Sequence, residues 1–213
     1  EFATAQGIDL YLQAADERIE PLRQQSQPSY TLDGLSLAFA PGDFIQVNGP
    51  VNQRMVEQAL SWLDAGKDDK VLDLFCGIGN FTLPLARQAR EVVGVEGELA
   101  MVARAEENAR RNGIDNARFY KADLSGDIVG MSWAREGFDL VLLDPARPGA
   151  LEVMSHVAAL SPKRVVYVSC NPVTLARDSQ VLVKGGYRLA CLGMLDMFPH
   201  TGHLESMALF ERD

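Results

Sequence analysis

The 213-residue chain contains no run of about 18 apolar residues, so its sequence predicts no segment that spans a membrane. Residues 1–4 also lack the basic and apolar stretches of a secretory signal peptide, and an initiator methionine is missing. We therefore expect a cytoplasmic protein that has been processed or is a fragment of a longer one.

Cysteine and histidine are scarce, at three residues each. Cys76, Cys170 and Cys191 stand singly, and no Cys-x-x-Cys pair indicates a zinc site or a disulfide framework. His200 and His203 are too few and too poorly spaced for a metal site. The sequence thus predicts no bound metal and a reducing compartment, with Cys76 packed under a loop and Cys191 in a strand core.

Positive charge is also in short supply, because 20 lysines and arginines face 29 aspartates and glutamates, for a net charge of −9. Affinity for a phosphate backbone comes mainly from lysine and arginine contacts. Taken alone, this balance argues against a nucleic-acid partner. The composition, 47% hydrophobic, is sufficient for one sizeable core.

Residues 1 to about 50 have the pattern of a short β-rich segment. Weak alternation over residues 8–12 predicts one strand, and the turn dipeptide Asp33-Gly34 divides residues 30–39 into two more. A further short strand is expected over residues 44–47. Residues 17–29, with two prolines and three glutamines, are typical of an exposed connection.

From residue 52 the period of the apolar residues changes. Met55, Val56 and Ala59 share one helical face, which predicts a helix over residues 52–65 that Gly66 ends. Beyond it, strands and helices alternate. The expected strands are 71–75, 92–96, 118–122, 138–143, 164–169, 187–195 and 204–210, and the expected helices are 81–89, 99–111, 151–160 and 173–183.

This order of elements predicts an α/β fold. Strands that alternate with helices form a parallel sheet covered on both faces, but the last two strands have no crossover helix and must pair antiparallel. A doubly wound, Rossmann-like sheet that ends in an antiparallel hairpin is the arrangement of class I methyltransferases. We therefore divide the chain into a β-rich segment, residues 1–50, and a catalytic domain, residues 51–213.

The first strand of this domain leads into a glycine-rich loop. Asp73 lies within the strand, and Gly77 and Gly79 let the backbone approach a ligand at the start of a helix. Glu96, at the end of the next strand, suits ribose hydroxyls. Dinucleotide enzymes share this pattern, but Thr82 stands where their third glycine would be. Asp73 also suits a cationic ligand better than a pyrophosphate.

Further acids follow other strands. Asp123 can accept a hydrogen bond from an adenine amine, and Asp144 begins the sequence Asp144-Pro145-Ala146-Arg147. Enzymes that methylate exocyclic amines often carry a second proline and an aromatic residue where this chain has Ala146 and Arg147. Any one acid is explained as well by capping of its own loop, but their common place at strand ends favours a ligand site.

Cys170 follows the strand 164–169, just before a helix. A single cysteine is more often a core residue. However, the carboxyl ends of parallel strands face the ligand crevice, and a helix N-terminus lowers the pKa of a thiol. A thiolate here can add to carbon 6 of a pyrimidine and so activate carbon 5 for methylation. Glu205 is a candidate base for the carbon 5 proton, although a solvated edge carboxylate explains it equally well.

Together these segments resemble the RNA uracil-5-methyltransferase family. The resemblance runs from about residue 44 to the C-terminus. It rests on residues 168–172, Val-Ser-Cys-Asn-Pro, on residues 198–207 with their His-Thr-Gly-His-Leu-Glu run, and on the stretches 44–48, 73–81, 95–97 and 143–147. It implies methyl transfer from S-adenosylmethionine to carbon 5 of a uridine, with Cys170 as the nucleophile and Glu205 as the base.

The resemblance also implies which residues touch the cofactor. Beside Asp73, Gly77 and Gly79, they are Gln46, Phe75, Asn80, Glu96, Asp123 and Asp144. Gln46 has the alternative of facing the target base, and members of the family often have asparagine at the place of Asp123.

Similarity to the bacterial members that modify 23S ribosomal RNA makes that RNA the expected substrate of a monomeric enzyme. Such members also carry an N-terminal RNA-binding TRAM domain and a domain that holds an iron–sulfur cluster on four cysteines. Neither is expected in this chain, which would account for its acidity and weaken its hold on RNA.

Two other interpretations stay open. Methylation of cytosine carbon 5 uses the same thiolate chemistry, but its RNA enzymes usually place proline immediately before the cysteine, where this chain has Ser169. The second is a module that binds the cofactor without catalysis and serves as an RNA scaffold.

Overall fold

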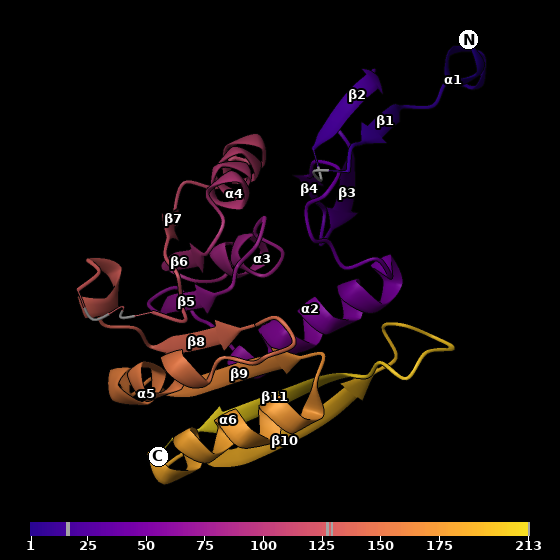
Figure 1. Cartoon of the computed structure of the whole chain (residues 1–213). Coiled ribbons are helices and arrows are strands. Elements are labelled where there is room, and N and C mark those ends of the chain that lie inside the picture. The colour runs from indigo at the N-terminus through magenta and orange to yellow at the C-terminus, as the bar shows by residue number, and fades with distance from the viewer. Residues whose placement is uncertain (16–17, 127, 129, 213) are drawn as a thin grey trace.

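The structure, a computed structural model, describes residues 1–15, 18–126, 128 and 130–212. Its largest element is a seven-stranded sheet in the order β10-β11-β9-β8-β5-β6-β7 (Figure 1). The strands are β5 Lys70–Leu74, β6 Glu91–Glu96, β7 Ala117–Lys121, β8 Leu140–Leu143, β9 Arg164–Ser169, β10 Arg188–Leu195 and β11 Glu205–Glu211. The helices are α1 Phe2–Gln6, α2 Gly49–Leu63, α3 Thr82–Ala86, α4 Leu99–Arg111, α5 Leu151–Leu160 and α6 Pro172–Lys184, with a 3-10 turn at Trp133–Arg135.

The direction of the strands confirms the predicted topology. Strands β5 to β9 run parallel to one another, whereas β11 pairs antiparallel with both β9 and β10. The register sets Ser206 of β11 opposite Ser169 of β9. The start of β11 therefore lies at the same edge of the sheet as the carboxyl ends of the parallel strands.

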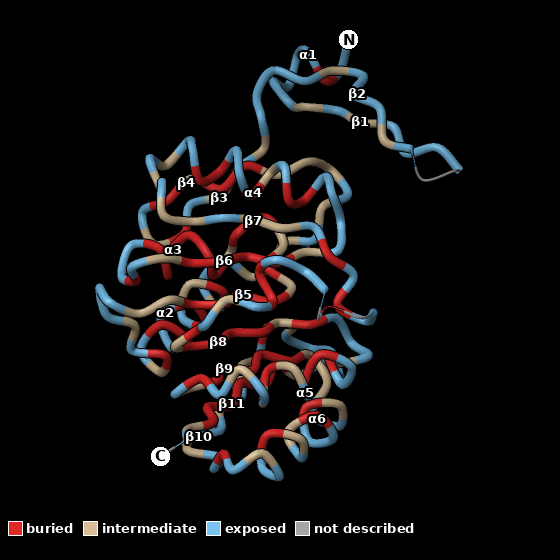
Figure 2. Tube along the Cα trace, turned by 90° about the vertical axis from the view of Figure 1, so that its left-hand side faces the viewer, coloured by how far each residue is buried: buried red, intermediate tan, exposed pale blue. Residues whose placement is uncertain are grey.

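Two hydrophobic cores cover the two faces of the sheet, because successive side chains of a strand point to opposite faces. In β5, Val71 belongs to the core that includes side chains of α2, α3 and α4, and Leu72 belongs to the core with α5 and α6. The strands β5, β6, β8, β9 and β11 lie in the buried interior between the helices, whereas the edge strands β10 and β7 are exposed or half-buried (Figure 2). Within the described ranges, none of the helices has the length and apolarity that a membrane span needs.

The first 50 residues contain two hairpins. β3 Ser29–Leu32 and β4 Leu35–Ala38 pair across Asp33-Gly34 as predicted, and their leucines are buried in the same core as α2. β1 Leu10–Gln13 and β2 Ile19–Arg23 form the second hairpin. This second hairpin and α1 stand away from the sheet (Figure 2).

Two sequence-based expectations for this region are wrong. β2 lies within residues 17–29, which were expected to be a connection; residue 17 is outside the described residues. Residues 44–47 form no strand. Phe44 and Val47 are exposed and have no strand beside them, and the chain turns directly into α2, where the side chain of Asn48 accepts a hydrogen bond from the Val51 N–H.

Two helices also differ from their expected bounds. α2 begins at Gly49, three residues before the expected start at residue 52. α2 ends at Leu63 because Asp64, with φ of 51°, takes the left-handed capping conformation that was assigned to Gly66. α3 covers only Thr82–Ala86 of the expected 81–89. By contrast, the bounds of α4, α5 and β9 agree with the expected ones.

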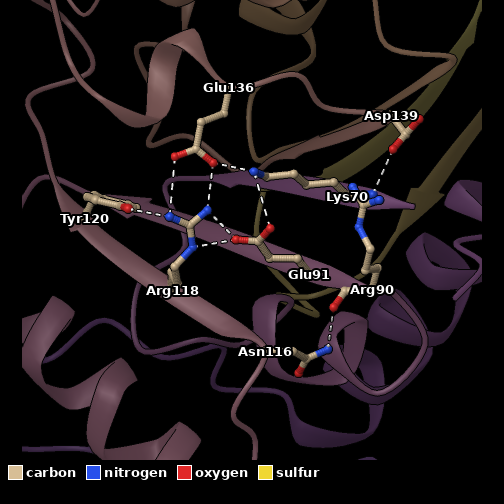
Figure 3. Close-up of polar contacts among 8 residues, drawn as sticks. All are labelled: Lys70, Arg90, Glu91, Asn116, Arg118, Tyr120, Glu136 and Asp139. Carbon is tan, nitrogen blue, oxygen red and sulfur yellow. Dashed lines mark hydrogen bonds and ion pairs between the residues drawn. The ribbon is translucent and has the colours of Figure 1, made fainter. Parts of the chain in front are cut away.

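An ion-pair network joins the amino ends of the parallel strands (Figure 3). Arg118 of β7 lies 2.7 Å from Glu136, and the Nζ of Lys70 in β5 contacts both Glu136 and, at 3.3 Å, Glu91 of β6. The Lys70 N–H also donates to Asp139, which precedes β8, at 2.9 Å. Since these residues come from different strands and loops, the network aligns the strands at the end remote from their carboxyl edge.

We expect Glu136→Gln to lower the free energy of unfolding at pH 7 by about 0.5–1 kcal/mol, because the network is only partly exposed. Burial favours the neutral acid, but hydrogen bonds from Arg118 and Lys70 outweigh it and hold the pKa of Glu136 below its usual value. The stabilisation is thus complete above about pH 4.3, the unfolded value, and is lost as the pH falls through the folded-state pKa.

Urea unfolding at pH 7 and near pH 4 measures this effect. Exposed Glu106, for which the structure has no ion pair among its described residues, provides the control Glu106→Gln. A Glu136→Gln loss that persists undiminished at the lower pH would contradict the electrostatic explanation.

Candidate active site

Polar side chains from five elements meet at the carboxyl edge of the parallel strands. β5 leads into Phe75, β6 ends with Glu96, and Asp144 follows β8. Cys170 follows β9, and Glu205 begins β11. The sheet order sets β11, β9, β8, β5 and β6 side by side, so residues that are far apart in the sequence share one rim.

The loop after β5, residues 75–81, turns sharply at this rim. Phe75, Gly77 and Gly79 have positive φ values of 63°, 55° and 98°. A Cβ atom at Gly79 would lie 3.0 Å from the Cγ of Leu83, so this position requires glycine. The left-handed conformation of the bulky Phe75 costs on the order of 1–3 kcal/mol, and it persists only where the surroundings fix the backbone.

Glu96 is one of the groups that fix this loop. Its Oε2 accepts a hydrogen bond from the Gly77 N–H at 3.0 Å, while its Oε1 accepts from the N–H groups of Gly97 at 2.6 Å and Glu98 at 3.1 Å. Its carboxylate thereby joins the end of β6 to the glycine-rich loop. Part of the capping role considered for Glu96 is thus present, together with its place at the rim.

Asp73 is fully buried directly below the rim. Its Oδ2 accepts a hydrogen bond from the Thr82 hydroxyl at 2.5 Å, but its Oδ1 is buried with no hydrogen-bond partner. Burial, opposed by the Thr82 bond and reinforced by the nearby charges of Asp144 and Glu96, raises the pKa of Asp73 to about 8. A buried acceptor without a donor is costly and indicates a site that a donor is meant to occupy.

Asp144 faces a cavity above the loop. The Gln46 amide donates to its Oδ2 across 3.4 Å, a long hydrogen bond. Burial raises the pKa of Asp144 to about 7, and the Gln46 bond only partly opposes this. The cavity is lined by Tyr30, Phe44, Ile45, Gln46, Phe75, Cys76, Gly77, Ile78, Asn80, Phe81 and Asp144.

Asn80 is held by two residues that were not predicted from the sequence. Its Oδ1 accepts from Asn52 of α2 at 2.9 Å and from the Tyr30 hydroxyl of β3 at 3.0 Å, and its Nδ2 donates back to Asn52 at 3.0 Å. Asn52 lies on the apolar face of α2 with Met55 and Val56. A polar residue on a buried helical face was the available signal for it.

Asp123 stands apart from this group. Its side chain is exposed, and its Oδ1 accepts from the Ser125 hydroxyl at 2.6 Å and the Ser125 N–H at 3.0 Å. These bonds hold the pKa of Asp123 below its usual value. The loop-capping role considered for this acid is therefore present, and Asp123 does not line the cavity.

Cys170 directly follows β9 and Glu205 begins the neighbouring strand β11, so both lie one step beyond the pair Ser169 and Ser206. Only 2% of the Glu205 surface is exposed, so the interpretation as a solvated edge carboxylate is wrong. Burial first, and then the charge of Asp144, raise the pKa of Glu205 to about 8. Such a carboxyl group is a far stronger base, when ionised, than an exposed glutamate.

The predicted lowering of the Cys170 pKa is also wrong for this structure. Burial and the charges of Glu205 and Asp144 raise the pKa of the half-buried thiol, and Arg147 opposes them only in part. Burial, together with the acids at the rim, therefore outweighs the effect expected from the start of α6.

The other two cysteines differ from each other. Cys76 is buried beneath the glycine-rich loop, as expected, whereas Cys191 is exposed. Cys191 was predicted to be core, but β10 is the edge strand of the sheet, and a side chain there can face solvent.

Helix α6 holds the loop that carries Asp144 and Arg147. The Asn171 amide donates to the Arg147 carbonyl at 3.2 Å, and the Ala150 N–H donates to the fully buried Asp178 at 2.7 Å. Arg147 also lies 3.3 Å from the His203 ring, in the loop before Glu205. These contacts thus link the segment around Cys170 to the loop that carries Asp144 and to the loop before β11.

The sheet order with one reversed strand, together with a glycine-rich loop and acids at the carboxyl rim, defines a class I methyltransferase fold. A solved structure with this fold is the Pyrococcus abyssi tRNA (uracil-54, C5)-methyltransferase in complex with S-adenosyl-L-homocysteine. It superposes with a TM-score of 0.76 at 30% identity, over 91% of this chain and 46% of that one. The structure of M. jannaschii TYW2 in complex with AdoMet shares the fold at 18% identity and a TM-score of 0.65, over 92% of this chain and 91% of that one.

The chain belongs to the tRNA (uracil-5-)-methyltransferase family, whose model matches residues 32–213. It is 91% identical over 212 residues to the 23S rRNA (uracil(1939)-C(5))-methyltransferase RlmD of Aeromonas hydrophila, and 60% identical over 213 residues to that of Yersinia enterocolitica. The matches cover 100% of this chain and 48% of each relative. The chain thus spans about half the length of the curated relatives it matches.

We expect Glu205→Gln to speed the alkylation of Cys170 by iodoacetamide, since it removes a negative charge that disfavours the thiolate. With a Glu205 pKa of about 8, that charge develops as the pH rises through 8, so the gain should grow above this pH, to roughly threefold to tenfold. Mass spectrometry of the peptides separates Cys170 from Cys76 and Cys191. Glu211→Gln, at the far end of β11, is the control, and an equal gain in both variants would refute the coupling.

Proposed function

We propose that this chain carries the catalytic unit of an enzyme that methylates carbon 5 of a uridine in RNA with S-adenosylmethionine. The observation that carries the proposal is the placement of the half-buried thiol of Cys170 and the buried carboxyl group of Glu205 at one rim of the sheet, each one step beyond the paired Ser169 and Ser206. The family supports uracil carbon 5 as the target, and the names of the relatives support 23S ribosomal RNA as the substrate. The division into residues 1–50 and a catalytic domain, residues 51–213, belongs to the same proposal.

The rim has carboxylate acceptors of the kind that bound S-adenosylmethionine would need. This molecule carries an ammonium group, and the buried Oδ1 of Asp73 is an acceptor without a donor. Asp144, whose only side-chain donor among the described residues is Gln46, provides a second negative charge beside the cavity. When bound, S-adenosylmethionine supplies an electrophilic methyl group on a sulfonium.

The remaining cofactor residues have distinct tasks under this proposal. Gly77 and Gly79 let the loop backbone approach the ligand, and Glu96, which already fixes Gly77, faces the ribose hydroxyls. Phe75, Gln46 and Asn80 contact the ligand from the cavity wall. Both hydrogen bonds from Ser125 end on Oδ1 of Asp123, so its Oδ2 is the oxygen that accepts a hydrogen bond from the adenine amine.

Cys170 performs the first step of the proposed reaction. Its Sγ forms a bond to carbon 6 of the uracil, and the π electrons of the carbon 5–carbon 6 bond move into an enolate. Carbon 5 then bonds to the methyl group, and the electrons of the methyl–sulfur bond stay on sulfur, leaving S-adenosylhomocysteine. The thiol must lose its proton first, and Arg147 is the neighbouring cation that favours this loss.

Glu205 completes the reaction as the base. Its carboxylate removes the remaining hydrogen from carbon 5, the double bond to carbon 6 re-forms, and the bond from carbon 6 to Sγ breaks. A pKa of about 8 leaves a minor fraction of the groups ionised at neutral pH, but it raises their basicity toward the value that proton abstraction needs.

We expect most of the affinity for RNA to come from the part of the relatives' sequences that this chain does not span. A net charge of −9 opposes contact with phosphates. We propose that a TRAM domain and a four-cysteine iron–sulfur domain, outside this chain, supply that contact in a monomeric, cytoplasmic enzyme.

The covalent step is testable with RNA that carries 5-fluorouridine. Fluorine at carbon 5 cannot be removed by Glu205, so an adduct that survives denaturation should accumulate when both RNA and S-adenosylmethionine are present. Cys170→Ala should abolish the adduct, and Glu205→Gln should trap it even on ordinary uridine RNA, because only the last step is blocked. The control Cys191→Ala removes an exposed thiol and should behave like the parent.

The adduct is measured by denaturing electrophoresis and peptide mass spectrometry. Because this chain spans half of its relatives, the same variants belong in a longer form that includes the remaining half. Methylation by Cys170→Ala at the parent rate would refute the mechanism, and unchanged turnover by Glu205→Gln would require a different base.

A further inference from the structure

The Asn80 side chain is held in a single orientation by elements that flank the central sheet. The Asn52 amide exchanges two hydrogen bonds with it, at 2.9 and 3.0 Å, and the Tyr30 hydroxyl adds a third at 3.0 Å. Asn52 is 1% exposed. Since the amides of Asn80 and Asn52 are reciprocal donors and acceptors, neither can rotate without breaking both bonds.

The opposite side of the same loop is held from α4. Buried Asn108 donates to the carbonyl of Ile78, in the loop, at 3.1 Å. It also donates to the Ala38 carbonyl of β4 at 3.0 Å and accepts from the Ala38 N–H at 2.8 Å. One side chain therefore links α4, the hairpin β3–β4 and the glycine-rich loop.

Two further residues extend this contact along α4. Asn112, one turn after Asn108, accepts from the Ser36 N–H at 2.9 Å and donates to the Ser36 carbonyl at 2.9 Å. Arg104, one turn before it, forms an ion pair with Asp43 at 2.5 Å. Side chains spaced four residues apart lie on one helical face, so this stripe seats the hairpin and the chain that leads to Gln46.

We propose that the β3–β4 hairpin is a working part of the cofactor site, in which Tyr30 and Asn52 are positioning residues that fix Asn80 for binding of the adenosyl amino acid. The inference rests on the proposed function, because it takes that ligand as the occupant of the cavity. Tyr30, Asn80 and Gln46 all line this cavity.

The physical reason is preorganisation. The loop carries a strained Phe75 and two glycines in the left-handed region, so its own conformational preference does not hold it in place. Hydrogen bonds from the hairpin and α2 order the loop before the ligand binds, so the entropy cost of ordering it does not lower the binding affinity. Without the Tyr30 hydroxyl, Asn80 keeps its bonds to Asn52 but loses its tie to the hairpin.

Calorimetry of S-adenosylhomocysteine binding to this chain tests the inference without RNA. Tyr30→Phe should weaken binding by roughly threefold to tenfold, the worth of one hydrogen bond. The matched control is Tyr187→Phe, which removes a buried hydroxyl that donates to the Pro162 carbonyl at 2.8 Å, away from the cavity. It should lower the melting temperature to a similar degree and leave the affinity unchanged.

A double-variant cycle distinguishes positioning from a general structural effect. If Tyr30 acts through Asn80, then Tyr30→Phe should cost no further affinity in an Asn80→Ala chain. An equal loss of affinity in both backgrounds, or no loss in the first, would overturn the inference.

Hydrogen exchange of the unliganded chain separates this outcome from failure of the proposed function. Exchange of the amides at residues 76–80 should be faster in Tyr30→Phe and unchanged in Tyr187→Phe. If the parent chain binds no S-adenosylhomocysteine but exchange is still faster in Tyr30→Phe than in the parent, the proposed ligand is rejected and the positioning role is kept. Unchanged exchange in Tyr30→Phe would reject the positioning role whatever the chain binds.

Discussion

Desolvation of carboxyl groups at one rim of a parallel sheet governs the properties of the site. Because parallel strands end at the same edge, the chain gathers Asp73, Asp144 and Glu205 there, although they are up to 132 residues apart in the sequence. Burial raises the pKa values of all three to about 7 or 8, and neighbouring carboxylates add to the rise at Asp73 and Glu205. All three groups therefore titrate near physiological pH, and a bound cation would favour their ionised forms.

The same acids affect Cys170. Burial first, and then the charges of Glu205 and Asp144, raise the pKa of its thiol, and Arg147 opposes them only in part. A cation held beside Asp144 would cancel part of this repulsion and favour the thiolate. Under the proposed function, a cationic ligand in the cavity would thus favour the thiolate of Cys170.

Local patterns in the sequence predicted the fold and the rim, because strand and helix periodicity and the position of acids directly after strands depend on short stretches of sequence. Contacts across the fold were not predictable in this way. Cys191 is exposed because β10 became an edge, residues 44–47 are not a strand because nothing pairs with them, and the Cys170 pKa depends on acids from other strands. The role of Tyr30 and Asn52 was not predictable from sequence, because their hydrogen bonds to Asn80 form only when β3 and α2 pack against the glycine-rich loop.

Proton exchange during cofactor binding is the most direct measurement of this account. Calorimetry of S-adenosylhomocysteine binding at pH 7, in buffers of different ionisation enthalpy, reports the number of protons gained or lost. An ammonium group beside Asp73 should lower a pKa that starts at about 8, so we expect protons to be released, and fewer from Asp73→Asn. Binding without proton release, or equal release by Asp73→Asn, would contradict the account.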